Sequence, residues 1–112
     1  MEETIVYNSL ARQLAPQIEA QLQTVVEPDL EIDVFNLGLI YAVDLTPEGH
    51  CHVKLTFTEL TCDCQATVLP QLAAALTKVA GIKAVTTEIV YTPAWTMARI
   101  TRNGRRFLGL AV

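Results

Sequence analysis

A short turn between two strand-like segments constrains the fold of this chain most strongly. Thr46-Pro47-Glu48-Gly49 has proline second and glycine last, an order that favours a type I turn. In the segment after it, residues 51–58, apolar side chains alternate with polar ones. The segment before it, residues 37–45, is apolar and strand-like. We therefore expect an antiparallel hairpin with one face in the core and the other facing solvent or a partner.

Helical spacing appears on both sides of this hairpin. Apolar residues recur every four positions from Leu10 to Leu22, which predicts an amphipathic helix over residues 9–26. Pro16 removes an interior hydrogen bond, so its regular part should start near Ala15. A second helix is expected over residues 63–79, with Pro70 as a kink or a late start. A third strand is expected over residues 84–91, with Val85, Ile89 and Tyr91 on its inner face.

The predicted order is therefore helix, strand, strand, helix, strand. It indicates a two-layer α+β fold with a small mixed sheet, and the length predicts a single domain over residues 1–112. The helix between the second and third strands makes those strands parallel, whereas the hairpin strands are antiparallel. The start of the first strand and the ends of the other two should thus share one rim of the sheet.

Polar and reactive residues gather at this predicted rim. They are Asp33, Asn36, Thr58, Glu59, Thr61, Cys62, Cys64, Thr92, Trp95 and Thr96. Cys62 and Cys64 lie at the start of the second helix, where unpaired N–H groups and the helix dipole favour a metal-binding or nucleophilic thiolate. Two thiols fill half of a four-thiolate site, which predicts a homodimer, a transient partner or an exogenous thiol. The alternative is that either cysteine simply packs in the core.

Other candidate groups have plainer interpretations. His50, Cys51 and His52 are consecutive strand residues, so their side chains alternate between the two faces of the strand. We therefore do not expect them to bind the same metal ion. Trp95 either caps the core or lines the site. The arginines near the C-terminus are typical of a solvated tail, with an acidic partner as the alternative. They are Arg99, Arg102, Arg105 and Arg106.

Charge and composition exclude several functions. Up to Asp63, eleven acidic side chains face two basic ones, and beyond it six basic side chains face Glu88 alone. With a net charge of −4, this asymmetry suits a protein partner better than a nucleic acid. Apolar runs are too short for a membrane span, and the acidic N-terminus is unlike a signal peptide. The three cysteines suggest free thiols in the cytoplasm. We see neither a nucleophile–base pair nor a phosphate loop, and expect no enzyme.

Ordered motifs along the chain also carry a family resemblance. They are Glu27-Pro28-Asp29-Leu30, Asn36-Leu37-Gly38-Leu39-Ile40-Tyr41, Lys54-Leu55-Thr56-Phe57-Thr58 leading to Cys62, Gly81-Ile82-Lys83-Ala84-Val85, Thr92-Pro93-Ala94-Trp95-Thr96, and Leu108-Gly109. With them the chain resembles the small metal-sulfur cluster biosynthesis family, the SufT- and PaaD-like iron-sulfur cluster assembly domains, over residues 26–109. It departs from the family pattern at Asn36, at Asp63 and at Ala94, where the family commonly has Asp, Pro and Pro.

The resemblance implies a function as well as a fold. It identifies Cys62 as the family's reactive cysteine and implies a labile iron-sulfur cluster or iron as cargo, with assembly proteins and apo-protein clients as partners. A carrier or maturation factor using Cys62 and Cys64 is the first hypothesis. A metal-free adaptor that docks assembly machinery or an oxygenase subunit is the second. A thiol-redox protein is the third, disfavoured because Cys-x-Cys closes a small strained ring.

Overall fold

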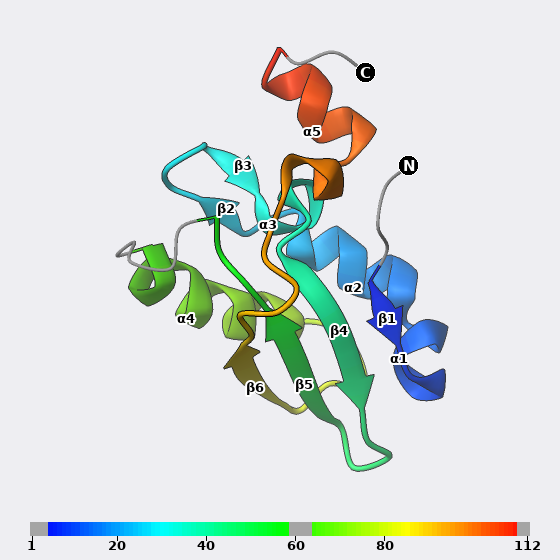
Figure 1. Ribbon diagram of the computed structural model, residues 1–112. Coiled ribbons are helices and arrows are strands. Elements are labelled where there is room, and N and C mark those ends of the chain that lie inside the picture. The colour runs from blue at the N-terminus through cyan, green and yellow to red at the C-terminus, as the bar shows by residue number, and fades with distance from the viewer. Residues whose placement is uncertain (1–4, 59–63, 110–112) are drawn as a thin grey trace.

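The computed structural model describes residues 5–58 and 64–109, with only the backbone of Cys64. Figure 1 shows the elements in space. In chain order they are β1 (Val6–Tyr7), α1 (Ser9–Gln13), α2 (Ala15–Leu22), β2 (Val26–Glu27), β3 (Ile32–Asp33), α3 (Val34–Leu37), β4 (Ile40–Leu45), β5 (His50–Leu55), α4 (Cys64–Leu76), β6 (Ala84–Ile89), the 3-10 helix η1 (Met97–Arg99) and α5 (Arg102–Phe107). Within these residues, no helix is both long and apolar enough to cross a membrane.

A four-stranded mixed sheet forms one layer of the molecule. Its strand order is β1-β4-β5-β6. β4 and β5 are antiparallel, whereas β5 and β6 are parallel, as the hairpin and the helical crossover predict. β2 and β3 pair separately. The expected two-layer α+β fold with a mixed sheet is confirmed, and β1, which pairs in parallel with β4, is an addition to it.

The core lies between the sheet and two helices. Figure 1 shows α2 and α4 together behind the sheet. Each contributes fully buried aliphatic side chains, which pack with the inward face of β5. These buried residues are Ile18, Leu22, Val68, Leu72, Leu76, Cys51, Val53 and Leu55. Burial of each large aliphatic side chain contributes on the order of 1.5–3 kcal/mol. The predicted core face of the second hairpin strand is confirmed.

Some predicted boundaries are wrong. The helix expected over residues 9–26 is divided at Leu14 into α1 and α2 and ends at Leu22. Its regular part does start at Ala15, as predicted, with Pro16 in the first turn of α2, where its missing N–H costs little. Thr56, expected on the outer face of a strand, is buried beyond the end of β5. Tyr91, expected on an inner face, is 64% exposed because β6 ends at Ile89. Val85 and Ile89 do pack against the core.

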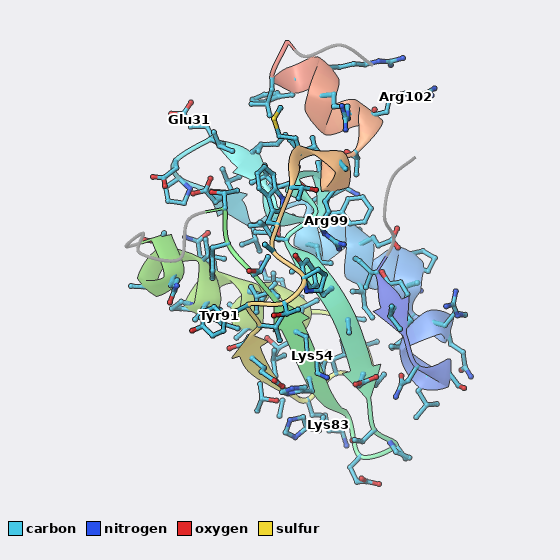
Figure 2. All side chains as sticks on the ribbon, viewed as in Figure 1. Glu31, Lys54, Lys83, Tyr91, Arg99 and Arg102 are labelled. Atoms are coloured by element: carbon cyan, nitrogen blue, oxygen red, sulfur yellow. The ribbon has the colours of Figure 1, made fainter. Side chains whose placement is uncertain are left out.

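The first hairpin strand also begins later than predicted. Residues 34–37 form the one-turn helix α3, which ends at Gly38 in the left-handed conformation, and β4 starts at Ile40. The C-terminal arginines are solvated only in part: Arg102 and Arg106 are exposed, but on a helix rather than a tail. Residues 102–107 form α5, and Arg99 is buried, with 6% of its surface exposed, beside the start of β4 (Figure 2).

Candidate functional site

The start of β4 and the ends of β5 and β6 lie at one rim of the sheet. Ile40 is paired with Leu55, and Leu55 is paired with Ile89. The three segments attached to these strand ends are α3 before β4, the chain after Leu55 and the chain after Ile89. The rim predicted from topology is therefore present.

A clamp formed by the C-terminal segment holds α3 in place. The indole Nε1 of Trp95 donates a hydrogen bond to the carbonyl oxygen of Leu37 at 2.7 Å. The Arg99 guanidinium donates to the carbonyl oxygens of Gly38, at 2.7 Å, and Ile40, at 3.2 Å. It also stacks on Tyr41, 4.0 Å from the ring centroid. Arg99 thus donates to carbonyl groups of the segment where α3 turns into β4.

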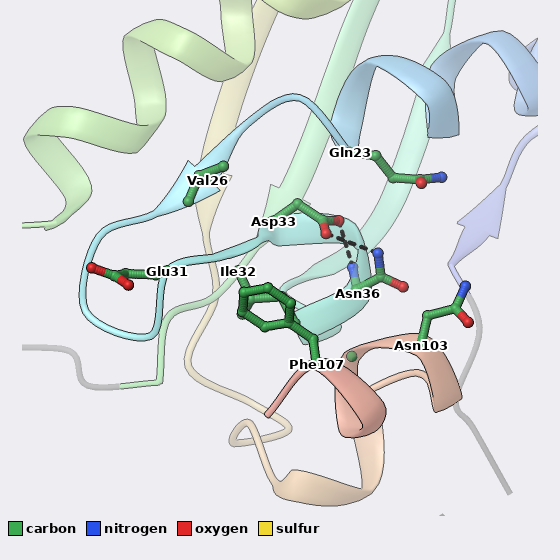
Figure 3. A pocket seen from close by; sticks show the side chains of 9 residues that line it. Gln23, Val26, Glu31, Ile32, Asp33, Asn36, Asn103 and Phe107 are labelled. Atoms are coloured by element: carbon green, nitrogen blue, oxygen red, sulfur yellow. Dashed lines mark hydrogen bonds between the residues drawn. The ribbon is translucent and has the colours of Figure 1, made fainter. Parts of the chain in front are cut away.

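Asp33, the last residue of β3, and Asn36 of α3 form a polar pair at the start of α3 (Figure 3). The two Asp33 carboxylate oxygens accept hydrogen bonds from the backbone N–H of Asn36, at 2.9 Å, and from its side-chain Nδ2, at 2.8 Å. Asp33 is therefore the N-cap of α3. The Asn36 side-chain oxygen accepts from the hydroxyl of Thr101, and its backbone oxygen accepts from the Thr101 N–H at 2.8 Å. An amide at position 36 can serve both partners, because it both donates and accepts.

The structure describes only some of the other predicted rim residues. Thr58 is half-buried and follows β5, whereas Thr92 and Thr96 are exposed and follow β6. Trp95 is half-buried and packs against the core, so it caps the core as well as bordering the rim. Glu59, Thr61 and Cys62 lie outside the described residues. Cys64 is the first residue of α4, as expected for a thiol at a helix start, but its side chain also lies outside them.

Cys51 is a core residue. Its side chain is fully buried, and this burial, with a smaller contribution from Asp44, raises the pKa of its thiol to about 11. At neutral pH the thiolate, which is the reactive and metal-binding form, is therefore scarce. Cys51 is therefore not a candidate for the reactive thiol.

We predict that Cys51 resists alkylation while the protein is folded. At about pH 8, iodoacetamide should modify it at least about 100-fold more slowly in buffer than in urea, where its pKa returns to about 8.5. Peptide mass spectrometry, which follows Cys51 apart from the other cysteines, measures both rates. Equal rates in buffer and in urea would contradict the buried position.

His50 and His52 lie on the opposite side of β5 from Cys51, as alternation predicts. His50 Nε2 and His52 Nδ1 are each 2.8 Å from the Thr86 hydroxyl, and His52 Nε2 is 2.9 Å from a Glu88 carboxylate oxygen. The hydrogen bond from His52 lowers the pKa of exposed Glu88. Among the described residues, no three His, Cys, Asp or Glu side chains are arranged to hold a metal ion.

Comparison with known proteins adds to this geometry. A family model described as "Iron-sulfur cluster assembly protein" matches residues 16–89, more than half of the chain. The chain belongs to this family. The matched region includes all but the first residue of α2, the strands β4 to β6, and Cys62 and Cys64. Membership associates the chain with iron-sulfur cluster assembly and confirms the resemblance drawn from the sequence motifs.

Members with curated names are similar over most of their length. The Fe-S protein maturation auxiliary factor YitW of Bacillus subtilis is 32% identical over 97 residues, which cover 87% of this chain and 95% of that protein. The Fe-S protein maturation auxiliary factor SufT of Staphylococcus aureus is 33% identical over 87 residues, which cover 78% of this chain and 99% of that protein.

Solved structures agree in fold. A domain of unknown function from Bacillus anthracis superposes with a TM-score of 0.83 at 24% identity, covering 93% of this chain and all of that chain. A Mycobacterium tuberculosis protein described as associated with [Fe-S] complex assembly and repair has a TM-score of 0.52 at 30% identity, covering 100% and 97% of the two chains.

The clamp includes residues that sequence reasoning missed. Arg99 was assigned to a tail, although it stands in a mostly apolar stretch between Trp95 and Ile100, where a single charge signals a buried partner. Thr101 also went unnoticed, although it is the N-cap of α5 and accepts from the backbone N–H of Gly104. A threonine is a common residue at a helix N-cap, and this weak signal could have indicated the start of the helix.

Proposed function

We propose that this chain is an iron-sulfur protein maturation factor that binds a labile cluster or iron through Cys62, with Cys64 as a second ligand, and passes it to apo-proteins. The family membership and the maturation factors among its relatives support the general role. The observation that carries the cysteine assignment is the position of the 13-residue helix α4, which begins at Cys64. The first N–H groups of such a helix lack intrahelical acceptors and favour a thiolate.

Labile binding follows from this ligand count. Two thiolates leave half of a four-ligand site to be completed by a second copy of the chain, an exogenous thiol or the recipient protein. Exchange of those outer ligands for the recipient's own cysteines releases the cargo without a catalytic step. The factor therefore acts as a stoichiometric carrier rather than an enzyme, and it works in the reducing cytoplasm, where its thiols stay free.

Anaerobic reconstitution with ferrous iron and sulfide tests the proposal. The wild-type protein should gain a visible charge-transfer absorption and bound iron and sulfide. Cys62→Ser should lose nearly all of both, because a serine hydroxyl is a poor ligand for a soft iron-sulfur cluster. Cys51→Ser is the matched control: it also removes one thiol, but a buried one, and should keep the wild-type iron content wherever the variant remains folded.

The same experiment separates the alternatives. A folded wild-type protein that takes up no iron would contradict the carrier and favour a metal-free adaptor. A reversible Cys62–Cys64 disulfide at the reduction potential of the cytosol would favour redox chemistry instead. Iron uptake in Cys62→Ser equal to that of the wild type would show that the cargo is held elsewhere.

A further inference from the structure

One end of the molecule contains a cavity of about 350 Å³ between the β2–β3 hairpin and α5. Figure 3 shows Phe107 reaching from α5 towards Ile32 of β3. Apolar side chains make up part of the lining, and the acidic side chains Glu31 and Asp33 lie among them. The described lining residues are Gln23, Val26, Glu31, Ile32, Asp33, Asn36, Asn103, Gly104 and Phe107, and none of them is basic.

The apolar part of this cavity is left open to solvent. Phe107 is 66% exposed and Val26 is 45% exposed. A large aromatic side chain that keeps most of its surface in water beside a cavity is a feature of interaction sites, because covering it removes apolar area from water. The cavity is thus suited to an apolar side chain with basic groups next to it.

The basic groups that match it stand on the same end of the molecule. Arg102 and Arg106 are exposed and four residues apart, so they share one side of α5. Asn103 and Phe107 share the neighbouring side, which lines the cavity. Figure 2 shows Glu31 and Arg102 pointing outward from the hairpin and from α5 at this end.

An acidic hairpin and a basic helix on either side of one partly apolar cavity make a self-complementary surface. A twofold axis through the cavity would set the α5 arginines of each copy against the acidic hairpin of the other, so that the contacts occur twice. It would also bring the two exposed Phe107 side chains to the centre, where aromatic residues contribute most to binding. A second copy of the chain therefore offers both the basic and the apolar side chains that fit this cavity.

We propose that this surface is an interface between two copies of the chain. It goes beyond the proposed function, because it rests on the charges and exposure of α5 and the hairpin rather than on the cysteines. It also bears on that function. Asp33 and Asn36 belong both to the cavity and to α3 at the rim, so association here places the two rims in one assembly, beside the same interface.

Sedimentation velocity of the full chain from about 1 μM to about 1 mM tests the proposal. The wild type should pass from monomer to dimer within this range. Phe107→Ser should raise the dimer dissociation constant by about 10- to 100-fold, since it removes the central aromatic contact. Glu31→Arg and Arg106→Glu should each raise it by about tenfold, because each places like charges in both symmetric contacts. Glu48→Arg, a matched charge reversal in the exposed β4–β5 turn, should leave the dimer dissociation constant unchanged.

Charge exchange gives the sharpest result. An equimolar mixture of Glu31→Arg and Arg106→Glu should dimerise again, because opposite charges then meet in both contacts, and so should the double variant. Circular dichroism shows that each variant remains folded. A wild type that stays monomeric at about 1 mM would overturn the proposal, and the surface would then suit another protein with a basic, apolar segment. Dimers that are unaffected by Phe107→Ser, or that show no rescue in the mixture, would overturn it as well.

The two proposals fail separately. Sedimentation velocity of the iron-free protein measures dimer formation. Bound iron and sulfide after reconstitution measure the cargo. A monomer that takes up iron through Cys62 would contradict only the interface. A dimer that takes up none would contradict only the carrier.

Discussion

Gly38→Ala should lower the free energy of unfolding by about 4 kcal/mol, among the largest losses seen for single substitutions. Two causes combine at this position. Gly38 has φ +73°, a conformation that alanine disfavours. An added Cβ would also lie 2.3 Å from the Arg99 carbonyl oxygen and 2.6 Å from the Arg99 Cβ, both too close for any real contact. Relief would require the clamp to move away from α3, and the hydrogen bonds at the rim would then be lost.

Gly109→Ala is the matched control for this prediction. Gly109 also has a positive φ, +75°, but no atom lies within 4 Å of the position that its Cβ would take. Its substitution should therefore cost only the conformational part, about 1 kcal/mol. Urea denaturation followed by circular dichroism measures both variants. Equal losses for the two would show that the close approach of Arg99 to Gly38 contributes nothing.

Arg99→Ala should cost about 3 kcal/mol of unfolding free energy. The substitution removes the donors to the Gly38 and Ile40 carbonyl oxygens and the stacking on Tyr41, and leaves those carbonyl groups short of partners. Hydrogen bonds from a charged donor contribute about 1.5–3 kcal/mol each, and the cost of unsatisfied acceptors adds to this.

Arg99→Lys keeps the charge but lacks the planar guanidinium fork, so it should recover only part of the loss. Arg106→Ala, an exposed arginine on α5, should stay within about 0.5 kcal/mol of the wild type under dilute conditions. The same urea titrations compare the three variants. A lysine that restored full stability would contradict the role of the guanidinium geometry.

The central part of the fold could be predicted because its signals are local. The Pro47–Gly49 turn fixes the β4–β5 hairpin, and the alternation from Cys51 to Phe57 fixes which face is buried. The helix between β5 and β6 then fixes their parallel pairing, and with it the rim. These signals are the turn residues, the alternation of apolar and polar side chains in a strand, and the helical connection between two strands. Each lies within a short stretch of chain, so a single sequence is enough to recognise it.

The elements that escaped prediction are short and depend on distant partners. β1 has two residues, and its place beside β4 is supported by the Asn8 side chain, which bonds both backbone groups of Leu45. α3 is a single turn, and its termini are satisfied by Asp33 and by the clamp. No hydrophobic period can develop over two to four residues, so neither element was predicted, and the strand after α3 was expected to begin at Leu37.

The candidate site, like the fold, was predicted in part. Topology was sufficient to bring Asp33, Asn36 and Trp95 to one rim. It did not show that Asp33 and Asn36 would bond each other and Thr101, since that depends on the side-chain geometry of residues up to 65 positions apart in sequence. The predicted helix start pointed to both Cys62 and Cys64, and the resemblance then identified Cys62 as the reactive one, because a lone Cys-x-Cys is a weak signal.

The clamp has a consequence for synthesis of the protein on the ribosome. Its donors come from residues 95–101, beyond the matched residues 16–89, so they leave the exit tunnel after every strand and after α4. Before then, the carbonyl oxygens of Leu37, Gly38 and Ile40 cannot accept the hydrogen bonds that Trp95 and Arg99 donate to them. In chain order, the strands and α4 are therefore synthesised before the residues of the clamp that complete the rim.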